Sequence, residues 1–130
     1  MKYLLLAYTK QADWDTVDVT SPEFLAACAF YEELGAELTA SGELLSTEGL
    51  AHPALSHTVR GGVDGPIASE GPFAESKEVL VSFAVVDCDS HDRVMAIATR
   101  ITGAVGDAVE VRPIMAGPPE QPGSSSSGEI

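Results

Sequence analysis

Two helical segments that lie between strand-like runs constrain the fold of this chain more than any other feature. Ser21, Pro22 and Glu23 form a typical helix start: a side-chain cap, a proline at the first helical position and an acid at the positive end of the helix dipole. Thr20 with Glu23 offers an alternative capping-box register. Gly42 suits the end of this helix. Its predicted apolar stripe comprises Phe24, Cys28, Tyr31, Leu34 and Leu38.

The second helix is predicted to begin after Asp89 or Ser90, either of which can cap it, and to end at Gly103. Its core positions are Val94, Ile97, Ala98 and Ile101. Residues 11–19 indicate an irregular acidic loop in which Trp14 covers the core. Strands are predicted over residues 2–8, 43–50, 57–60, 66–69, 79–86 and 109–115.

This order of elements predicts an α+β fold on a βαβ-βαβ plan, with both helices on one face of a mostly antiparallel sheet. The other face would then carry Leu4, Leu6, Val81 and Phe83, which is too much apolar surface to leave in water. Two sheets stacked across a two-fold axis would cover it. We therefore expect a homodimer.

The stretch from Ser69 to Val79 combines a Gly-Pro step, one aromatic residue and several charges just before the most apolar strand. Gly71 can adopt a positive φ and Pro72 restricts its own φ, so the backbone has few conformations available. Phe73 is predicted to anchor the loop in apolar surroundings. An ordered, charged loop between strands is a common place for a functional site, although a structural corner with solvated charges explains the composition equally well.

The same stretch resembles a known family signature. Residues 70–78, E-G-P-F-A-E-S-K-E, are similar to the D-G-P-F-x-E-[ST]-K-E motif of the DGPF group of YCII-related proteins, with Glu70 in place of the leading aspartate. The first strand, the segment 48–50, T-V-R at 58–60 and V-E-V-R-P-I at 109–114 also resemble family segments, in family order. Thr47 replaces a glycine of the family's G-E-G-L segment, and Val81-Ser82 replaces the small or glycine pair before the aromatic of the strand.

The resemblance implies a YCII-related domain over residues 1–115 with a ferredoxin-like fold that pairs into a dimeric α/β barrel. The wider group is associated with a His–Asp pair whose histidine precedes the first helix. The matching segment here, residues 21–24, has no histidine, so that pair does not carry over. Relatives are often encoded near alternative sigma factors, which suggests regulation.

Composition excludes several classes of function. Twenty acidic residues against seven basic ones give a formal charge of −13, which opposes binding to nucleic acid or to an anionic membrane. We find neither a signal-peptide pattern nor a long apolar run, and we expect a cytoplasmic protein. Cys28 and Cys88 form no C-x-x-C pair. Residues 116–130 are rich in Gly, Pro and Ser and are predicted to be a disordered tail outside the fold.

The remaining candidates for chemistry are polar residues at the ends of strands. Their carboxylates and cations could bind a small polar ligand or form a structural ion-pair network. The network is favoured for Glu78 with Arg112, and the ligand role for Glu48 and Glu70. The candidate ligand-binding residues are Glu48, Glu70, Phe73, Lys77, Glu78 and Arg112. The candidate general bases are Glu48, Glu70 and His57. The positions of His52, His57 and His91 match no metal motif, and neither a metal nor a cofactor is predicted.

Three functions fit these residues. The first is the binding of a small polar ligand in a cleft beside the Glu70–Phe73 motif. The second is a small-molecule enzyme with a carboxylate general base, and the third is a regulatory protein-interaction module linked to a sigma factor. A perturbed carboxylate pKa would favour the enzyme, and stabilisation by a ligand without turnover would favour the binding protein.

Overall fold

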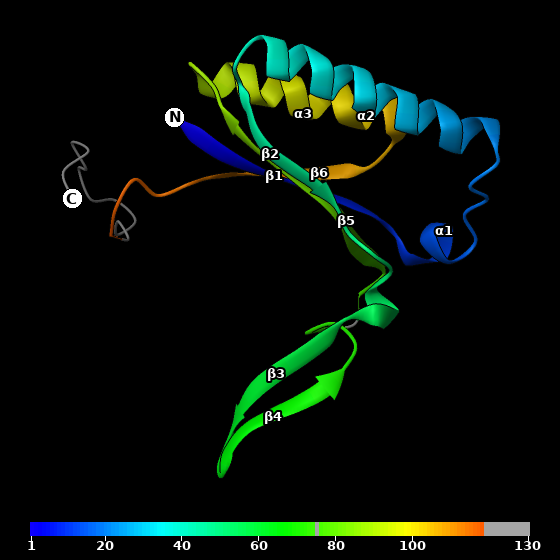
Figure 1. Ribbon diagram of the computed structural model, residues 1–130, viewed down its shortest axis with the longest axis vertical. Coiled ribbons are helices and arrows are strands. Elements are labelled where there is room, and N and C mark those ends of the chain that lie inside the picture. Colours follow the sequence, from blue (N-terminus) through cyan, green and yellow to red (C-terminus); the bar gives the residue numbers. More distant parts are fainter. Residues whose placement is uncertain (75, 119–130) are drawn as a thin grey trace.

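The computed structural model describes residues 1–74 and 76–118 of the 130 in the chain. Figure 1 shows a curved sheet with two long helices on one face and a separate hairpin on the other side. In chain order the elements are β1 (Lys2–Lys10), α1 (Gln11–Asp15), α2 (Pro22–Ala40), β2 (Leu44–Gly49), η1 (Pro53–Leu55), β3 (His57–Gly62), β4 (Gly65–Glu70), β5 (Glu78–Asp87), α3 (His91–Val105) and β6 (Ala108–Pro113).

The four-stranded sheet has the order β2-β5-β1-β6, and every neighbouring pair is antiparallel. With α2 and α3 as the crossing helices, this is an α+β architecture compatible with the ferredoxin-like fold. The predicted plan and the placement of both helices on one face are therefore confirmed (Figure 1). None of the helices in the described part of the chain is long and apolar enough to cross a membrane.

The ends of both long helices follow from local sequence. The Ser21 hydroxyl accepts the backbone N–H of Phe24 at 3.1 Å, which selects Ser21 as the cap of α2. After α2, Gly42 has a φ of 80° and Glu43 donates its backbone N–H to the carbonyl of Leu38 at 2.9 Å, the Schellman pattern. Ser90 caps α3 by accepting the N–H of Arg93.

Three local predictions were wrong. Helix α3 runs past Gly103 to Val105, because the left-handed residue that ends it is Gly106, with a φ of 82°. The predicted loop over residues 11–19 begins with the short helix α1. Cys28, predicted on the apolar stripe of α2, is exposed. Of the predicted tail, residues 119–130 lie outside the described residues.

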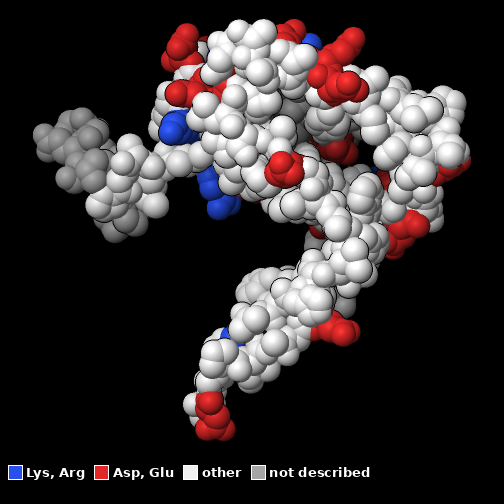
Figure 2. Space-filling view, in the orientation of Figure 1, with Lys and Arg blue, Asp and Glu red and all other residues white. Residues whose placement is uncertain are grey.

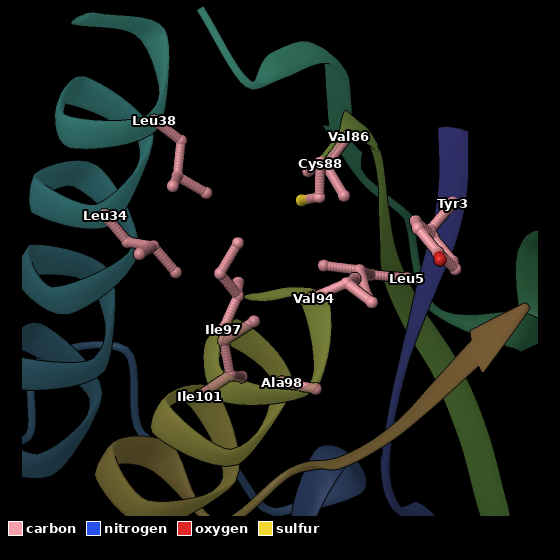
Figure 3. Close-up of a cluster of buried hydrophobic side chains, with 10 residues drawn as sticks. All are labelled: Tyr3, Leu5, Leu34, Leu38, Val86, Cys88, Val94, Ile97, Ala98 and Ile101. Carbon is pink, nitrogen blue, oxygen red and sulfur yellow. The ribbon is translucent and has the colours of Figure 1, made fainter. Parts of the chain in front are cut away.

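The core lies between the helices and the sheet (Figure 3). Leu34 and Leu38 of α2 are buried against α3 and the strands, whereas the N-terminal half of α2 contributes no buried residue. Four side chains are almost completely inaccessible to solvent: Val86, Cys88, Val94 and Ile97. The members of the core cluster are Tyr3, Leu5, Leu34, Leu38, Val86, Cys88, Val94, Ile97, Ala98 and Ile101.

The opposite face of the sheet is open in the single chain. Cross-strand register pairs Leu4 with Val85 and Leu6 with Phe83, so these four side chains share one face. All four are only partly buried. Val81, predicted on the same face, lies instead at an irregularity in the pairing of β5 with β1.

A bidentate ion pair connects the end of α2 to the start of α3. Nε and Nη2 of Arg93 each lie 2.9 Å from a carboxylate oxygen of Glu43. The hydrogen bonds from Arg93 lower the pKa of Glu43 from 4.5 to about 2.

We expect this pair to make stability depend on pH below pH 5. Because the pKa of Glu43 is lower in the folded chain than in the unfolded chain, its contribution is complete above about pH 4.5 and is lost as the pH falls towards 2. The loss should be about 1–2 kcal/mol, since Arg93 is partly exposed. Urea melts of the wild type and of Glu43→Gln measure it. Equal pH dependence of the two proteins in this range would contradict the assignment.

Candidate functional site

The structure separates the polar residues that the sequence analysis grouped together. Glu70 lies at the end of β4, opposite His57 of β3, and Glu48 lies on β2, opposite Phe83 of β5. Glu78 begins β5 and Lys77 precedes it. Arg112 lies on the edge strand β6.

The ion-pair network expected between Glu78 and Arg112 is not formed. Glu78 is paired in register with Lys10 and Arg112 with Leu4, positions six residues apart on β1 and hence about 20 Å along the strand. Arg112 pairs instead with Glu110 of its own strand, with 2.5 Å between Nη2 and Oε2. Charges of Glu78 and Arg112 therefore do not connect the segment around the Glu70–Phe73 motif to strand β6.

Phe73 is not the buried anchor that was predicted. Its side chain is 72% exposed, and the guanidinium of Arg60 lies 4.6 Å from the centre of its ring. Arg60 also donates a hydrogen bond to the carbonyl of Phe73. The aromatic ring and the cation thus cover each other at the surface, an interaction worth about 0.5–1 kcal/mol when exposed.

We expect Phe73→Ala and Glu70→Gln each to change the free energy of unfolding of the single chain by less than about 1 kcal/mol, because both side chains are exposed. Chemical denaturation of the two variants tests this. A loss of about 3 kcal/mol for Phe73→Ala would indicate that the ring is buried in solution, by a second chain or by the loop itself.

A cleft of about 1120 Å³ does lie beside the motif, where the hairpin joins the sheet. Among the predicted residues, His57, Phe73 and Glu78 line this cleft. Glu48, Glu70, Lys77 and Arg112 do not.

His52 also lines this cleft and pairs with Asp15, and both of its ring nitrogens already have hydrogen-bond partners. Nε2 of His52 lies 2.5 Å from Oδ1 of Asp15, and Nδ1 accepts the backbone N–H of Ala54 at 3.0 Å. Because Nδ1 is an acceptor, the ring proton is on Nε2 and points to Asp15. Neither nitrogen is free to take a proton from a ligand, so the pair ties α1 to η1 instead of serving as a general base.

A second groove, of about 840 Å³, lies beneath the N-terminal half of α2. It exists because α2 approaches the sheet closely only in its C-terminal half, at Leu34 and Leu38. Figure 2 shows the surface hollowed below this helix. The walls come from α1, α2, α3, β1, β2, β5 and β6, and most of the lining side chains are apolar. Of the predicted candidates, only Glu48 lines this groove.

Two polar groups in this groove stand out. The indole N–H of Trp14 is buried and has no hydrogen-bond partner in the described part of the chain. Asp107, between α3 and β6, accepts the hydroxyl of Tyr31 from α2 at 2.9 Å. Burial raises the pKa of Asp107, although hydrogen bonds from Tyr31 and Thr9 oppose the rise. Burial and the adjacent carboxylate raise the pKa of Tyr31 far above its usual range.

Sequence reasoning missed this groove. Trp14 was predicted to cover the core and Tyr31 to lie on an apolar stripe, and both do border the same space, but Asp107 belongs to no motif. The one available signal was Thr9, a polar residue that continues the alternation of the apolar residues Tyr3, Leu5 and Ala7 on β1. Among residues 1–74 and 76–118, no group of three or more His, Cys, Asp or Glu side chains could hold a metal ion.

Comparison with known proteins identifies the family to which the chain belongs. Residues 1–117 match the YCII-related domain. A curated relative, an uncharacterized protein of Rhizobium meliloti strain 1021, is 33% identical over 76 residues, which are 57% of this chain and 61% of the relative. The chain thus spans less than two thirds of the length of this relative.

Proposed function

This chain belongs to the YCII-related family, and we propose that it binds a small, mainly apolar ligand in the groove beneath α2. The observation that carries the proposal is that Trp14 lines a mainly apolar groove while its indole N–H is buried and has no hydrogen-bond partner among the described residues. A buried donor without an acceptor costs about 1–3 kcal/mol. The N–H has almost no accessible surface in the free chain, so a ligand acceptor that removes this cost must reach it through a turn of the indole ring towards the groove.

The groove indicates what the ligand must offer. Its volume of about 840 Å³ lies in the range of small-molecule sites, which combine apolar walls with a few polar groups. Trp14 requires a hydrogen-bond acceptor, and the carboxylate of Asp107 favours a donor or a cation. Small amides with an apolar ring or chain meet both requirements, because the carbonyl accepts and the N–H donates, whereas protonated amines meet only the requirement of Asp107.

Trp14 also provides the assay, because it is the only tryptophan of the chain. We expect amides or amines that raise the melting temperature also to shift its fluorescence. Trp14→Phe keeps an aromatic ring but removes the N–H, and should weaken binding measured by calorimetry about tenfold. Asp107→Asn should weaken the binding of amines more than that of neutral amides.

The cleft beside the Glu70–Phe73 motif is the competing site for such a ligand, and Phe73→Ser is the matched control. The groove is the wrong site if binding leaves Trp14 fluorescence unchanged and is lost in Phe73→Ser but not in Trp14→Phe. If no compound of the panel raises the melting temperature or shifts the fluorescence, the binding proposal itself fails.

Catalysis by a carboxylate general base is the second candidate, and the raised pKa of Asp107 is the observation that favours it. The charged form of Asp107 is needed to accept a proton. Turnover of a bound compound should therefore increase as the pH rises through the pKa of Asp107 and should be lost in Asp107→Asn. Binding without turnover supports the binding protein alone.

The open face of the sheet supports a further part of the proposal, a homodimer of the α/β-barrel type. Leu4, Leu6, Phe83 and Val85 lie together on this face and are only partly buried. A second sheet related by a two-fold axis would bury them, and it would present the same apolar face in return. Light scattering at micromolar concentration tests the assembly, and a monomer there would contradict it.

A further inference from the structure

The hairpin of β3 and β4, residues 57–70 and called the arm below, is largely exposed on both faces in the described part of the chain, apart from the contact of Arg60 with Phe73. Within the described residues β3 pairs only with β4, in a two-stranded sheet separate from the main one. Figure 1 shows the arm projecting past the end of the main sheet, on the side away from the helices. A two-stranded hairpin alone in water is marginally stable at best. The arm therefore needs a partner surface.

Both faces of the arm expose apolar side chains. Register pairs Val59 with Ala68 on one face and Arg60 with Ile67 on the other. The Val59 side chain is 66% exposed and that of Ile67 is 60% exposed. Val63, at the tip, is fully exposed. β-branched residues exposed on strands that each have one unpaired edge are typical of an interaction surface and are costly to leave in water.

The charge distribution favours a second copy of the chain as the partner. Arg60, Asp64 and Glu70 give the arm a formal charge of −1, out of −13 for the whole chain. Helix α2 alone carries four glutamates and no Lys or Arg. Figure 2 shows acidic side chains gathered over the helices, whereas most of the arm is neutral. Two strongly acidic copies repel each other least where they meet through the arm.

We propose that the arm of each protomer packs against a second copy of the chain in the homodimer proposed above, on which this inference rests. The arm stands on the side of the sheet that carries the open face, so a copy covering that face lies beside the arm. Each strand of the arm has six residues and reaches about 20 Å, enough to extend along a neighbouring domain. In a two-fold dimer the two arms make equivalent contacts.

The test compares the wild type with the double variant Val59→Ser/Ile67→Ser. Sedimentation equilibrium should show dimerisation weakened at least about tenfold, because two apolar anchors are lost. The matched control is Val19→Ser/Leu25→Ser, whose side chains are 59% and 56% exposed in the loop before α2 and in α2 itself, outside the arm. It should dimerise like the wild type. In the wild type, the backbone amides of β3 and β4 should exchange slowly when the dimer forms and faster on dilution.

The outcomes separate this inference from the homodimer itself. If the arm variant dimerises like the wild type and arm amides exchange at the same rate at every concentration, the arm inference is wrong and the homodimer stands. If the wild type is a monomer at micromolar concentration, the proposal of a homodimer is wrong, and the inference about the arm is then wrong as well. Arm amides protected in a monomeric wild type would also overturn it, since the chain would then cover its own arm.

Discussion

Replacement of Ile97 by alanine is expected to lower the free energy of unfolding by about 3–4 kcal/mol, the largest single effect in the fold. The Ile97 side chain is 1% exposed and lies in α3 between Leu34 and Leu38 of α2 and the sheet (Figure 3). Truncation removes apolar surface from the core and leaves a cavity that its neighbours cannot fill completely. Such a loss is a large fraction of the stability of a domain of this size. Urea denaturation followed by circular dichroism measures it.

Met95→Ala is the control for this prediction. Met95 lies on the same helix, but its side chain is 40% exposed, so truncation should cost less than about 1 kcal/mol. Similar losses for the two variants would mean that α3 does not pack against the sheet through the Ile97 side.

The second large effect is expected at the open face of the sheet. Leu6→Lys should weaken the homodimer about 100-fold, because an unpaired ammonium would have to leave water at the centre of an apolar interface. The folded single chain should tolerate the change, since Leu6 is only partly buried and a lysine at this position can keep its ammonium in water. Sedimentation equilibrium gives the dissociation constant, and a thermal melt checks the fold.

Leu25→Lys provides the matched control, because Leu25 is 56% exposed on α2, away from the open face. It should leave dimerisation unchanged. A dimer that survives Leu6→Lys but not Leu25→Lys would place the interface on the helices and would refute the barrel-type assembly.

The order of strands and helices could be predicted because each signal is local. A serine followed by proline and glutamate begins α2, and a glycine in the left-handed region ends it, whatever lies elsewhere in the chain. The continuous apolar run over residues 3–8 similarly identifies β1 as a strand, with apolar side chains on both of its faces. The error at the end of α3 has the same origin. Gly103 and Gly106 are equal candidates in sequence, and only the backbone conformation shows that Gly106 ends the helix.

The candidate site could be predicted much less well, because it depends on distances across the fold. Glu78 and Arg112 both lie at strand ends, yet the antiparallel register of β1 with its two neighbours sets them at opposite ends of the sheet. Phe73 is the kind of residue that anchors a loop, but in the described part of the chain its side chain is 72% exposed.

What the sequence by itself determined is the order of the strands and of the two long helices, and where these helices begin to within one residue, all of which follow from residues within a few positions of one another. Tertiary structure alone decided which side chains meet. Trp14, Tyr31 and Asp107 come from three separate segments, and they border one groove because the N-terminal half of α2 does not approach the sheet closely. The arm likewise has the sequence of an ordinary hairpin, and only its position beyond the main sheet leaves both of its faces exposed. Burial and proximity are properties of the whole packed chain, so no local pattern encodes them.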